Sequence, residues 1–416
     1  CGLGMARTTD ARRKKALLGC SLATNLGLLG TFKYFDFFAS SFARLLGVLG
    51  MQADGVTLGL VLPVGISFYT FQTLSYTIDV YRGRLEPERD PVVFALFVAF
   101  FPQLVAGPIE RAARLLPQIR HPRRLTGAHV GSGLWMVSWG FFLKIFMADN
   151  LAPIADGVFG RAGPVEGITA LLGVYAFAFQ ILGDFAGYSF IAMGIAKLLG
   201  IELSTNFLFP YFVTNPRDFW RNWHITLSTW LRDYLYIPLG GNRGTTARVA
   251  RNLMATMLLG GLWHGAAWTF VVWGAYQGAL LIAHRGIESI VRRRRGEREP
   301  PGGAAWAAVK VVAMFHLTCL GWLIFRANSV TQVRDLALGM LAHVEMPTQA
   351  VVLTFERLVF YAGLTLAVQW LQRRSGEVTS VAGIPGILRV PLAAAMVYAL
   401  LVWGNYGGSE FIYFQF

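Results

Sequence analysis

The sequence predicts an all-α integral membrane protein, a polytopic bundle of transmembrane helices. Of its 416 residues, 55% are hydrophobic and only 14% are charged, whereas soluble domains usually carry about a quarter of charged residues. Apolar stretches long enough to cross the roughly 30 Å hydrocarbon layer recur along the whole chain. Each is expected to be helical, because lipid offers an unpaired backbone no hydrogen-bond partner.

The positive charge points to a membrane rather than to nucleic acid. The formal net charge is +14, but the basic residues gather in short loops between apolar segments, as the positive-inside rule requires. We expect all of these clusters on the cytoplasmic side: Arg12 to Lys15, Arg111 to Arg124, Arg248 to Arg251 and Arg292 to Arg295. The cysteines, Cys1, Cys20 and Cys319, lack the spacing of a disulfide framework or a metal site.

The expected elements follow the apolar segments in order. Segment 91–108 is expected to be re-entrant because Pro102 and Gly107-Pro108 interrupt it. Residues 202–250 are too polar to span and too aromatic for a solvated loop, and 286–303 is expected to be a flexible cytoplasmic loop. The remaining segments are expected to span the membrane: about 16–37, 56–80, 128–148, 167–183, 185–200, 253–284 with a break, 304–325, 352–371 and 387–404.

These segments are expected to form a single membrane domain over residues 1–416. The chain begins at Cys1, not at a methionine, directly before a charged patch. We therefore expect one or two N-terminal spans to be missing from it.

The stretch 214–243 is the most informative polar segment. Asn215 before Pro216 predicts a helix start, and Pro238 with Gly240-Gly241 predicts its end. In a helix of about five turns, one face carries Arg217, Arg221, His224 and Ser228, and the other carries Trp220, Trp223, Leu227, Trp230 and Tyr234. Either the helix lies in the membrane interface, with arginines near lipid phosphates, or its cations bind an anionic substrate.

His264 is the candidate catalytic residue. It lies inside an apolar hairpin, 258–281, between Gly260-Gly261 and Gly265. An ionisable side chain at such depth is a functional-site hypothesis by default, although a histidine hydrogen-bonded across helices is the alternative. Burial disfavours the charged ring, so we expect a neutral imidazole that can act as a general base.

Other chemistries lack their motifs. None of the seven histidines is followed by an aspartate five residues later, and no GxSxG elbow occurs. No two histidines have the i, i+4 spacing of an HExxH zinc site, so no metal is expected.

Specific motifs recur along nearly the whole chain. They are FKYFDFF (32–38), LPVGISFYTFQTLSYTIDVYRG (62–83), FFPQLVAGPIER (100–111), FWRNWHITLSTWLRDYLYIPLGGNR (219–243), LLGGLWHGAAW (258–268), FRA (325–327) and FIYFQF (411–416). Through these motifs the chain resembles the membrane-bound O-acyltransferase (MBOAT) family, most closely its bacterial alginate O-acetyltransferase branch.

The resemblance implies a fold with re-entrant and interfacial helices around a central tunnel, in the bacterial cytoplasmic (inner) membrane. It implies transfer of an acyl group, usually acetyl, from a cytoplasmic thioester donor such as acetyl-CoA, with no bound cofactor. The acyl group would pass to an extracytoplasmic acetyltransferase or carrier protein and to a polysaccharide hydroxyl. His264 matches the family's catalytic histidine, and His224 matches the second histidine of its FWRxWH motif.

The expected roles of the other site residues follow from this scheme. The thioester is expected to enter near Arg217, Arg221 and Arg232, and either His224 or Asn222 is expected to steady the oxyanion. Trp223 and Tyr188 are candidate tunnel walls. Ser228 and Asp184 complete the expected substrate-binding set.

One motif departs from the family. Relatives commonly carry QIYxDFSGYSDxAIG, whereas this chain has QILGDFAGYSFIAMG at 180–194, with Ala186 and Phe190 in place of a serine and an aspartate. Three alternatives stay open: peptidoglycan O-acetylation, teichoic-acid D-alanylation, and a non-enzymatic transporter of lipid-linked sugars. A transporter would usually be built from repeated halves, and we find no repeat.

Overall fold

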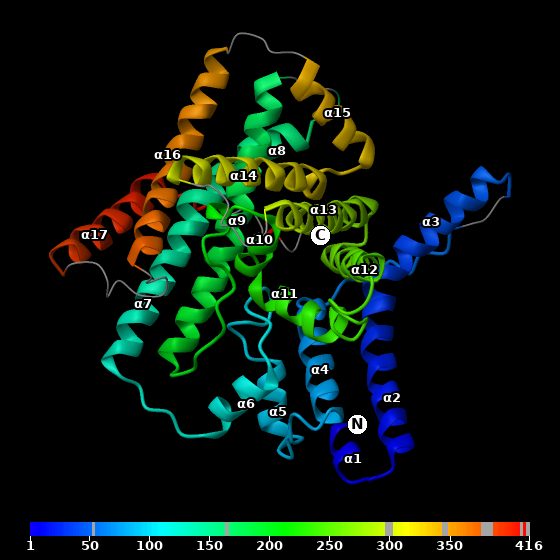
Figure 1. Cartoon of the computed structure of the whole chain (residues 1–416). Helices are drawn as coiled ribbons and strands as arrows, with labels where there is room; N and C mark the ends of the chain where they lie inside the picture. Colours follow the sequence, from blue (N-terminus) through cyan, green and yellow to red (C-terminus); the bar gives the residue numbers. More distant parts are fainter. Residues whose placement is uncertain are drawn as a thin grey trace.

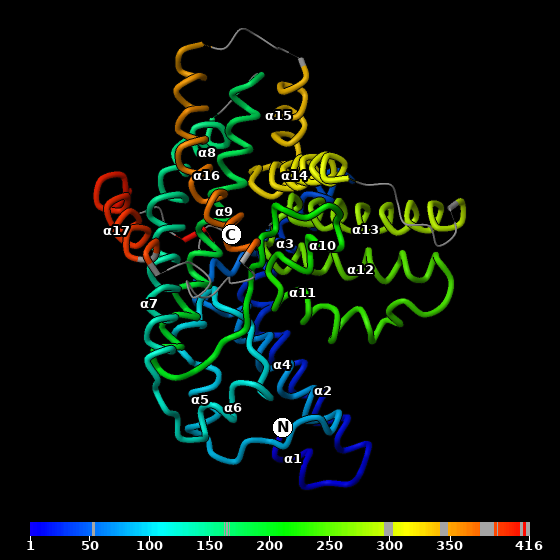
Figure 2. The backbone as a smooth tube through the Cα atoms, turned by 60° about the vertical axis from the view of Figure 1, so that its left-hand side comes forward, coloured from blue at the N-terminus to red at the C-terminus, as the bar shows by residue number. Residues whose placement is uncertain are grey.

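The computed structural model is an assembly of α-helices, and the predicted all-α class is confirmed (Figure 1). The structure describes residues 1–51, 55–161, 163, 165, 167–295, 303–342, 348–375, 386–407 and 411–412. Within these ranges it contains no β-strand. The helices do not all run in one direction: the axes of α12 and α13 are roughly perpendicular to those of α7 and α9 (Figure 2).

The N-terminal part is a long, bent helical run followed by a shorter helix packed against it. The short α1 (Gly2–Ala6) precedes α2 (Ala11–Leu29), which continues through the π-helical turn η1 (Gly30–Tyr34) into α3 (Phe35–Val48). Helix α4 (Ile66–Tyr81) packs along α2. The predicted span 56–80 therefore starts too early. Residues 56–63 are not helical, and Gly65 at the helix boundary has φ 76°, which ends any continuation toward the N-terminus.

The predicted break in segment 91–108 is confirmed. Asp90 caps α5 (Pro91–Val98), and turns replace the helix from Ala99 to Gly107. Helix α6 (Ala112–Arg120) follows and packs on α5. Both lie near α1, at the end of the molecule where α2 begins (Figure 1). Whether this segment enters and leaves the membrane on one side stays a prediction.

The long helices form the second part of the molecule. Helices α7 (Gly127–Phe141), η2 (Phe142–Ala148) and α8 (Asp149–Phe159) continue into one another, and α9 (Gly167–Leu198) packs along all three. The prediction of two spans at 167–183 and 185–200 is wrong, because α9 passes through Asp184 without a break. The Asp184 carboxylate is paired 2.7 Å from Lys144 Nζ of η2, so a charged residue can stay inside the helix.

The segment 214–243 does not form the single helix of five turns that was predicted. Helix α10 (Pro216–Asn222) ends at Trp223, α11 (Ile225–Leu231) begins after His224, and the π-helical η4 (Arg232–Tyr236) follows. His224 separates the two helices because its backbone is left-handed, with φ 43°. The start is as predicted: Asn215 accepts a hydrogen bond from Asp218 N.

The helix break expected within 253–284 is confirmed. Helix α12 (Thr246–His264) and helix α13 (Trp268–Arg295) form a hairpin whose turn is Gly265 to Ala267. The expectation of a loop over 286–303 is wrong for 286–295, which continue α13 as helix; 296–302 lie outside the described residues. Arginines at 292–294 favour a helical end because they complement its dipole.

The C-terminal part contains α14 (Ala304–Arg326), α15 (Val330–Ala342), α16 (Gln349–Ser375) and α17 (Gly386–Trp403). Three of these match the predicted segments, and α15 was not predicted. Among the residues that the structure describes, four stretches are long and apolar enough to cross a membrane: Gly127–Phe159, Gly167–Leu198, Ala304–Arg326 and Gln349–Arg374. The side of the membrane on which each basic cluster lies, and a single domain lacking N-terminal spans, stay predictions.

The α12–α13 hairpin gives a testable consequence for stability. A Cβ added at Gly261 would lie 2.3 Å from the carbonyl oxygen of Phe270. We expect Gly261→Ala to lower the free energy of unfolding by about 1–3 kcal/mol, because backbone must move to admit the methyl group. Denaturation in detergent, followed by far-ultraviolet circular dichroism, measures it.

Gly19→Ala is the matched control. Gly19 lies inside α2 and a Cβ there meets no atom within 4 Å. Alanine should therefore stabilise this helix by about 0.5–1 kcal/mol. Equal effects of the two substitutions would contradict close packing of the hairpin at Gly261.

Candidate active site around His264

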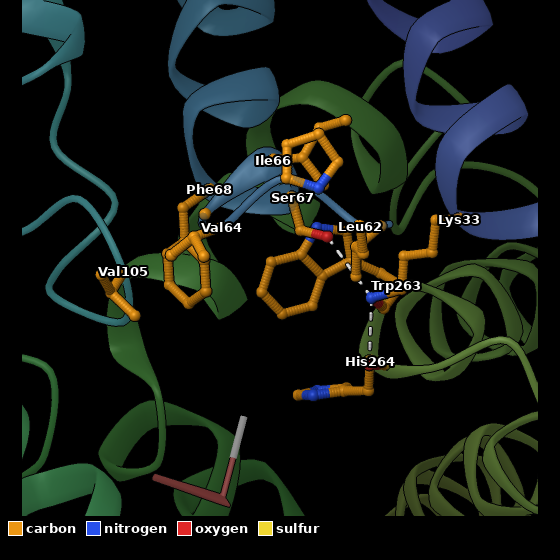
Figure 3. A pocket seen from close by; sticks show the side chains of 11 residues that line it. Lys33, Leu62, Val64, Ile66, Ser67, Phe68, Val105, Trp263 and His264 are labelled. Carbon is orange, nitrogen blue, oxygen red and sulfur yellow. Dashed lines mark hydrogen bonds between the residues drawn. The ribbon is translucent and has the colours of Figure 1, made fainter. Parts of the chain in front are cut away.

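His264 is the last residue of α12 and lines a small pocket, called here the cavity, which opens beside the exposed side chains of Leu62 and Val64. Its side chain is buried, and the residue is 5% exposed. The cavity has a volume of about 120 Å³ and lies between the end of α12, the start of α4 and the turn before Gly107 (Figure 3). Its lining comprises Lys33, Leu62, Pro63, Val64, Gly65, Ile66, Ser67, Phe68, Val105, Trp263 and His264.

Aromatic rings surround the imidazole of His264 on several sides. The ring centroids of Trp263 and Trp273 each lie 5.1 Å from that of His264, and the centroid of Phe325 lies 5.4 Å away. All these contacts are edge to face. The indole nitrogens of Trp263 and Trp273 are buried and have no hydrogen-bond partner in the part of the chain that the structure describes. Two unpaired N–H donors therefore lie on rings that contact His264.

The end of α12 is held by two side chains from η1. Lys33 Nζ donates hydrogen bonds to the carbonyl oxygens of Trp263 (2.8 Å) and His264 (3.1 Å). The hydroxyl of Tyr34 donates to the carbonyl oxygen of Leu262 at 3.0 Å. These carbonyls belong to the last turn of α12 and have no partner within the helix. The ammonium group also complements the negative end of the helix dipole.

Lys33 also connects α12 to α4. Its Nζ lies 3.3 Å from the hydroxyl oxygen of Ser67 in the first turn of α4, as Figure 3 shows. Lys33 and Tyr34 are consecutive residues of the π-helical turn η1, and both side chains reach the end of α12. Such turns are frequent at functional sites.

Gly65 forms the opposite wall of the cavity. With φ 76°, its backbone lies so close to the turn at Leu104 that a Cβ would be 2.5 Å from the Leu104 carbonyl oxygen. This contact brings Val105 into the lining. The hydroxyl of Tyr188 on α9 lies at the backbone N–H groups of Val105 and Ala106. Tyr188 thus supports the cavity wall from behind.

His224 lies near His264 but does not line the cavity. It is fully buried, and its ring centroid is 6.0 Å from that of Trp263, which also contacts His264. Its Nδ1 lies 3.0 Å from Asn206 Oδ1, and that oxygen also accepts hydrogen bonds from the backbone N–H and hydroxyl of Thr226. The Asn206 amide nitrogen faces the hydroxyl of Ser189 at 3.2 Å.

This network fixes the protonation of the His224 ring. Because Asn206 Oδ1 can only accept, His224 Nδ1 must carry the hydrogen. The Nε2 atom of the neutral ring is then an acceptor, and it has no partner among the described residues. The backbone of His224 is left-handed, a conformation that is uncommon among non-glycine residues although histidine adopts it more often than most.

The three arginines expected at a donor entrance lie at the surface. Arg217 pairs with Glu288, Arg221 with Asp218 at 3.2 Å, and Arg232 with Asp233 at 2.8 Å. None of these arginines lines the cavity at His264. Their part in donor binding stays a prediction.

The other predicted substrate-binding residues make internal contacts. Asn222 donates from its amide to the carbonyl oxygen of Asp218, and Ser228 donates to that of Trp223. Trp223 is buried and stacks on Phe219, with ring centroids 5.7 Å apart.

Asp184 fastens α9 to two other parts of the chain. Besides its pair with Lys144, it accepts a hydrogen bond from Ile412 N at 2.6 Å. Lys144 also lies 2.8 Å from Asp149, so one ammonium serves two carboxylates. Phe190, at the position where relatives carry an aspartate, is buried and 6% exposed. An unpaired carboxylate there would be costly, and phenylalanine is accommodated.

Sequence reasoning assigned no role to Lys33, Tyr34, Ser67 or Gly65. All four lie in the stretches FKYFDFF and LPVGISFYTF, on which the family resemblance was partly based. A lysine within an otherwise apolar segment was the available signal. Among the described residues, no group of three or more histidine, cysteine or acidic side chains could hold a metal ion.

Comparison with known proteins identifies the class. Residues 87–323 match the MBOAT, membrane-bound O-acyltransferase family, over more than half of the chain. This protein therefore belongs to that family, as its motifs predicted, and it is a multi-pass membrane protein.

Three curated relatives show which members of the family this chain is similar to. The chain is 44% identical to the probable alginate O-acetylase AlgI of Azotobacter vinelandii, over 79% of this chain and 63% of the relative. It is 43% identical to the probable alginate O-acetylase AlgI of Pseudomonas aeruginosa, and the match covers 77% of this chain and 59% of the relative. It is 37% identical to the peptidoglycan O-acetyltransferase of Helicobacter pylori, and the match covers 81% of this chain and 67% of the relative. The chain thus spans about three fifths of the length of the AlgI relatives.

Lys33→Met tests how the end of α12 is held. The substitution keeps an aliphatic side chain but leaves the carbonyl oxygens of Trp263 and His264 without their donor. We expect the free energy of unfolding to fall by about 1–3 kcal/mol, the usual cost of leaving buried polar groups unpaired. Denaturant titration of the purified protein in detergent measures the loss.

Lys15→Met provides the comparison, because Lys15 is exposed near the start of the same helical run. It should change the stability by less than about 0.5 kcal/mol. If both variants unfold at the same denaturant concentration as the wild type, Lys33 does not stabilise α12.

Proposed function

We propose that this protein is a membrane O-acyltransferase in which His264 is the general base. The observation that supports this most directly is a buried imidazole at the edge of a small cavity, on the helix end that carries the family's WHG motif. The family match supplies the reaction class. A histidine within hydrogen-bond reach of an acceptor hydroxyl is the usual arrangement for this chemistry.

The proposed reaction moves one acyl group from sulfur to oxygen. His264 accepts the proton of the acceptor hydroxyl while the hydroxyl oxygen attacks the thioester carbonyl carbon. The tetrahedral intermediate then collapses, the carbon–sulfur bond breaks, and the proton passes from the imidazolium to the departing thiolate. The products are an O-acyl ester and a free thiol, so atoms and charges balance.

The oxyanion of the intermediate needs N–H donors that are not already engaged. Either His224 or Asn222 was expected in this role. The Nδ1–H group of His224 donates to Asn206, one N–H of Asn222 donates to Asp218, and neither residue lines the cavity at His264. We propose instead the indole N–H group of Trp263, which is unpaired among the described residues and lies on a cavity-lining ring in contact with His264. His224 then acts through Trp263 as a positioning residue.

We propose acetyl as the acyl group and an extracytoplasmic polysaccharide as the final acceptor. Identity to the probable alginate O-acetylases is higher than to the peptidoglycan O-acetyltransferase, which favours the first acceptor class over the second. The donor would be a cytoplasmic thioester such as acetyl-CoA, entering near Arg217, Arg221 and Arg232. The proposed location is the bacterial inner membrane, with an extracytoplasmic transferase or carrier protein as partner.

The test replaces His264 by alanine in a strain that lacks the native gene. Loss of a general base lowers rates by about 10²–10⁴-fold, so polysaccharide-bound acetyl should fall to background. Mass spectrometry of the isolated polysaccharide measures acetyl, and immunoblotting of membranes measures protein abundance.

His121→Ala is the control, because His121 is exposed in the loop after α6. This variant should acetylate normally. If His264→Ala retains acetylation at normal abundance, His264 is not the base, and a transporter of lipid-linked sugars becomes the better explanation.

A further inference from the structure

We infer that the hydroxyl group of Ser67 is a second hydrogen-bond donor to the oxyanion that forms during acyl transfer at His264, and that Lys33 holds this hydroxyl in its donating role. The inference deepens the proposed function and rests on it. Trp263 supplies one donor there, and oxyanion sites commonly combine more than one preorganised donor. Ser67 lines the same cavity as Trp263 and His264, and it is 9% exposed.

The contact with Lys33 leaves the hydrogen of the Ser67 hydroxyl available. An ammonium group carries three hydrogens and accepts none, so Lys33 Nζ donates to Ser67 Oγ across 3.3 Å. The other hydrogens of Lys33 have acceptors in the carbonyl oxygens of Trp263 and His264. The hydroxyl hydrogen of Ser67 has no acceptor within the described ranges of the chain. Ser67 can therefore donate this hydrogen to a group that enters the cavity.

The positive charge of Lys33 is favoured where the side chain lies. Two carbonyl oxygens at the end of α12 accept from its ammonium group, and this end of the helix carries the negative pole of the dipole. A hydroxyl that accepts a hydrogen bond from a cation becomes a stronger donor, because hydrogen bonds in a chain polarise one another. The interaction that caps α12 thus also prepares Ser67 to stabilise a developing negative charge.

The start of α4 adds positive potential at the same place. Ser67 is the second residue of α4, and the N-cap residue Gly65 provides no side-chain cap. The backbone N–H of Ser67 has no hydrogen-bond partner among the residues that the structure describes. A helix N-terminus carries partial positive charge, and this one borders the cavity through Gly65, Ile66 and Ser67. An oxyanion beside Ser67 is accordingly stabilised by the dipole of α4 as well.

The separation of Ser67 from the base fits a division of roles. Figure 3 shows Ser67 with Lys33 on one side of the Trp263 indole and the imidazole of His264 on the other side. A general base contacts the attacking oxygen, whereas an oxyanion donor contacts the carbonyl oxygen of the acyl group. The two must therefore lie at different ends of the reacting group. A cavity of about 120 Å³ has room for such a small group.

The proposed step leaves the covalent bonds of Ser67 unchanged. As the acceptor hydroxyl attacks, an electron pair of the thioester C=O bond moves onto its oxygen, and the Ser67 O–H and Trp263 N–H groups donate to this oxyanion. When the carbon–sulfur bond breaks, the C=O bond forms again and the thiolate takes the proton from His264. These hydrogen bonds strengthen as the charge develops, so losing one should lower kcat more than it raises the KM for the donor.

The first measurement is thiol release from acetyl-CoA by the purified full-length protein in lipid nanodiscs, with de-O-acetylated alginate as the acceptor. Ser67→Ala should lower kcat about 10²–10³-fold, the usual effect of removing one oxyanion donor. The KM for acetyl-CoA should change by less than about threefold.

Ser75→Ala is the matched control. Ser75 lies on the same helix and is 1% exposed, and its hydroxyl donates to the carbonyl oxygen of Gln72 at 2.8 Å. It does not line the cavity. This variant should keep the kcat of the wild type, which separates loss of the Ser67 donor from loss of a buried hydroxyl on α4.

The second measurement distinguishes an oxyanion donor from a residue that only supports the fold. S-ethyl-CoA has no carbonyl oxygen, whereas the hydrate of a trifluoromethyl ketone analogue of acetyl-CoA has the tetrahedral oxygens of the intermediate. By calorimetry, Ser67→Ala should weaken binding of the ketone about tenfold or more and leave binding of S-ethyl-CoA unchanged. Lys33→Met should also weaken ketone binding, and the double variant should lose less than the two single effects combined, because Lys33 acts through Ser67.

The outcomes separate this inference from the proposed function. Wild-type protein that binds neither analogue, or thiol release that His264→Ala leaves unchanged, overturns the proposed function and this inference with it. Thiol release that depends on His264 but is normal in Ser67→Ala overturns the role of Ser67 alone, and so does equal weakening of both analogues. An acetyl group found by mass spectrometry on the peptide that contains Ser67 makes it a nucleophile and also overturns the inference. Fully additive effects on ketone binding overturn the part given to Lys33.

Discussion

The arrangement of this site depends on how the end of α12 is satisfied in an apolar environment. A helix that ends inside the protein exposes carbonyl oxygens that need donors, and each one left unpaired costs free energy. Lys33 and Tyr34 supply those donors from η1, and Lys33 also reaches Ser67 on α4. One ammonium group therefore fixes the relative positions of α12 and α4, between which the cavity at His264 lies.

The same interaction explains why His264 can stay in place next to open space. A cavity removes packing contacts from one side of a side chain, so the remaining contacts must hold it. The rings of Trp273 and Phe325 contact the imidazole edge to face, and Lys33 donates a hydrogen bond to the backbone carbonyl oxygen of His264. These contacts hold His264 in place. The turn from Gly265 to Ala267 leads directly from His264 into α13, which begins at Trp268.

Much of the fold was predictable because apolar runs in a membrane protein must be helical. The breaks were less predictable, since they depend on partners far away in sequence. Asp184 appeared to divide α9 but is paired with Lys144, and His224 appeared to lie within one helix but separates two. Among the candidate site residues, His264 could be proposed from its apolar surroundings and its family motif, and its role stays a prediction. Lys33 was not, because its contacts with α12 are more than 200 residues away in sequence.

The size of the cavity at His264 limits how the substrates can approach the imidazole. At about 120 Å³, the cavity at His264 is well below the range of about 300–1,000 Å³ that is usual for a whole small-molecule ligand. Under the proposed function, only the reacting ends of donor and acceptor can meet there, and the larger parts of both must be bound elsewhere.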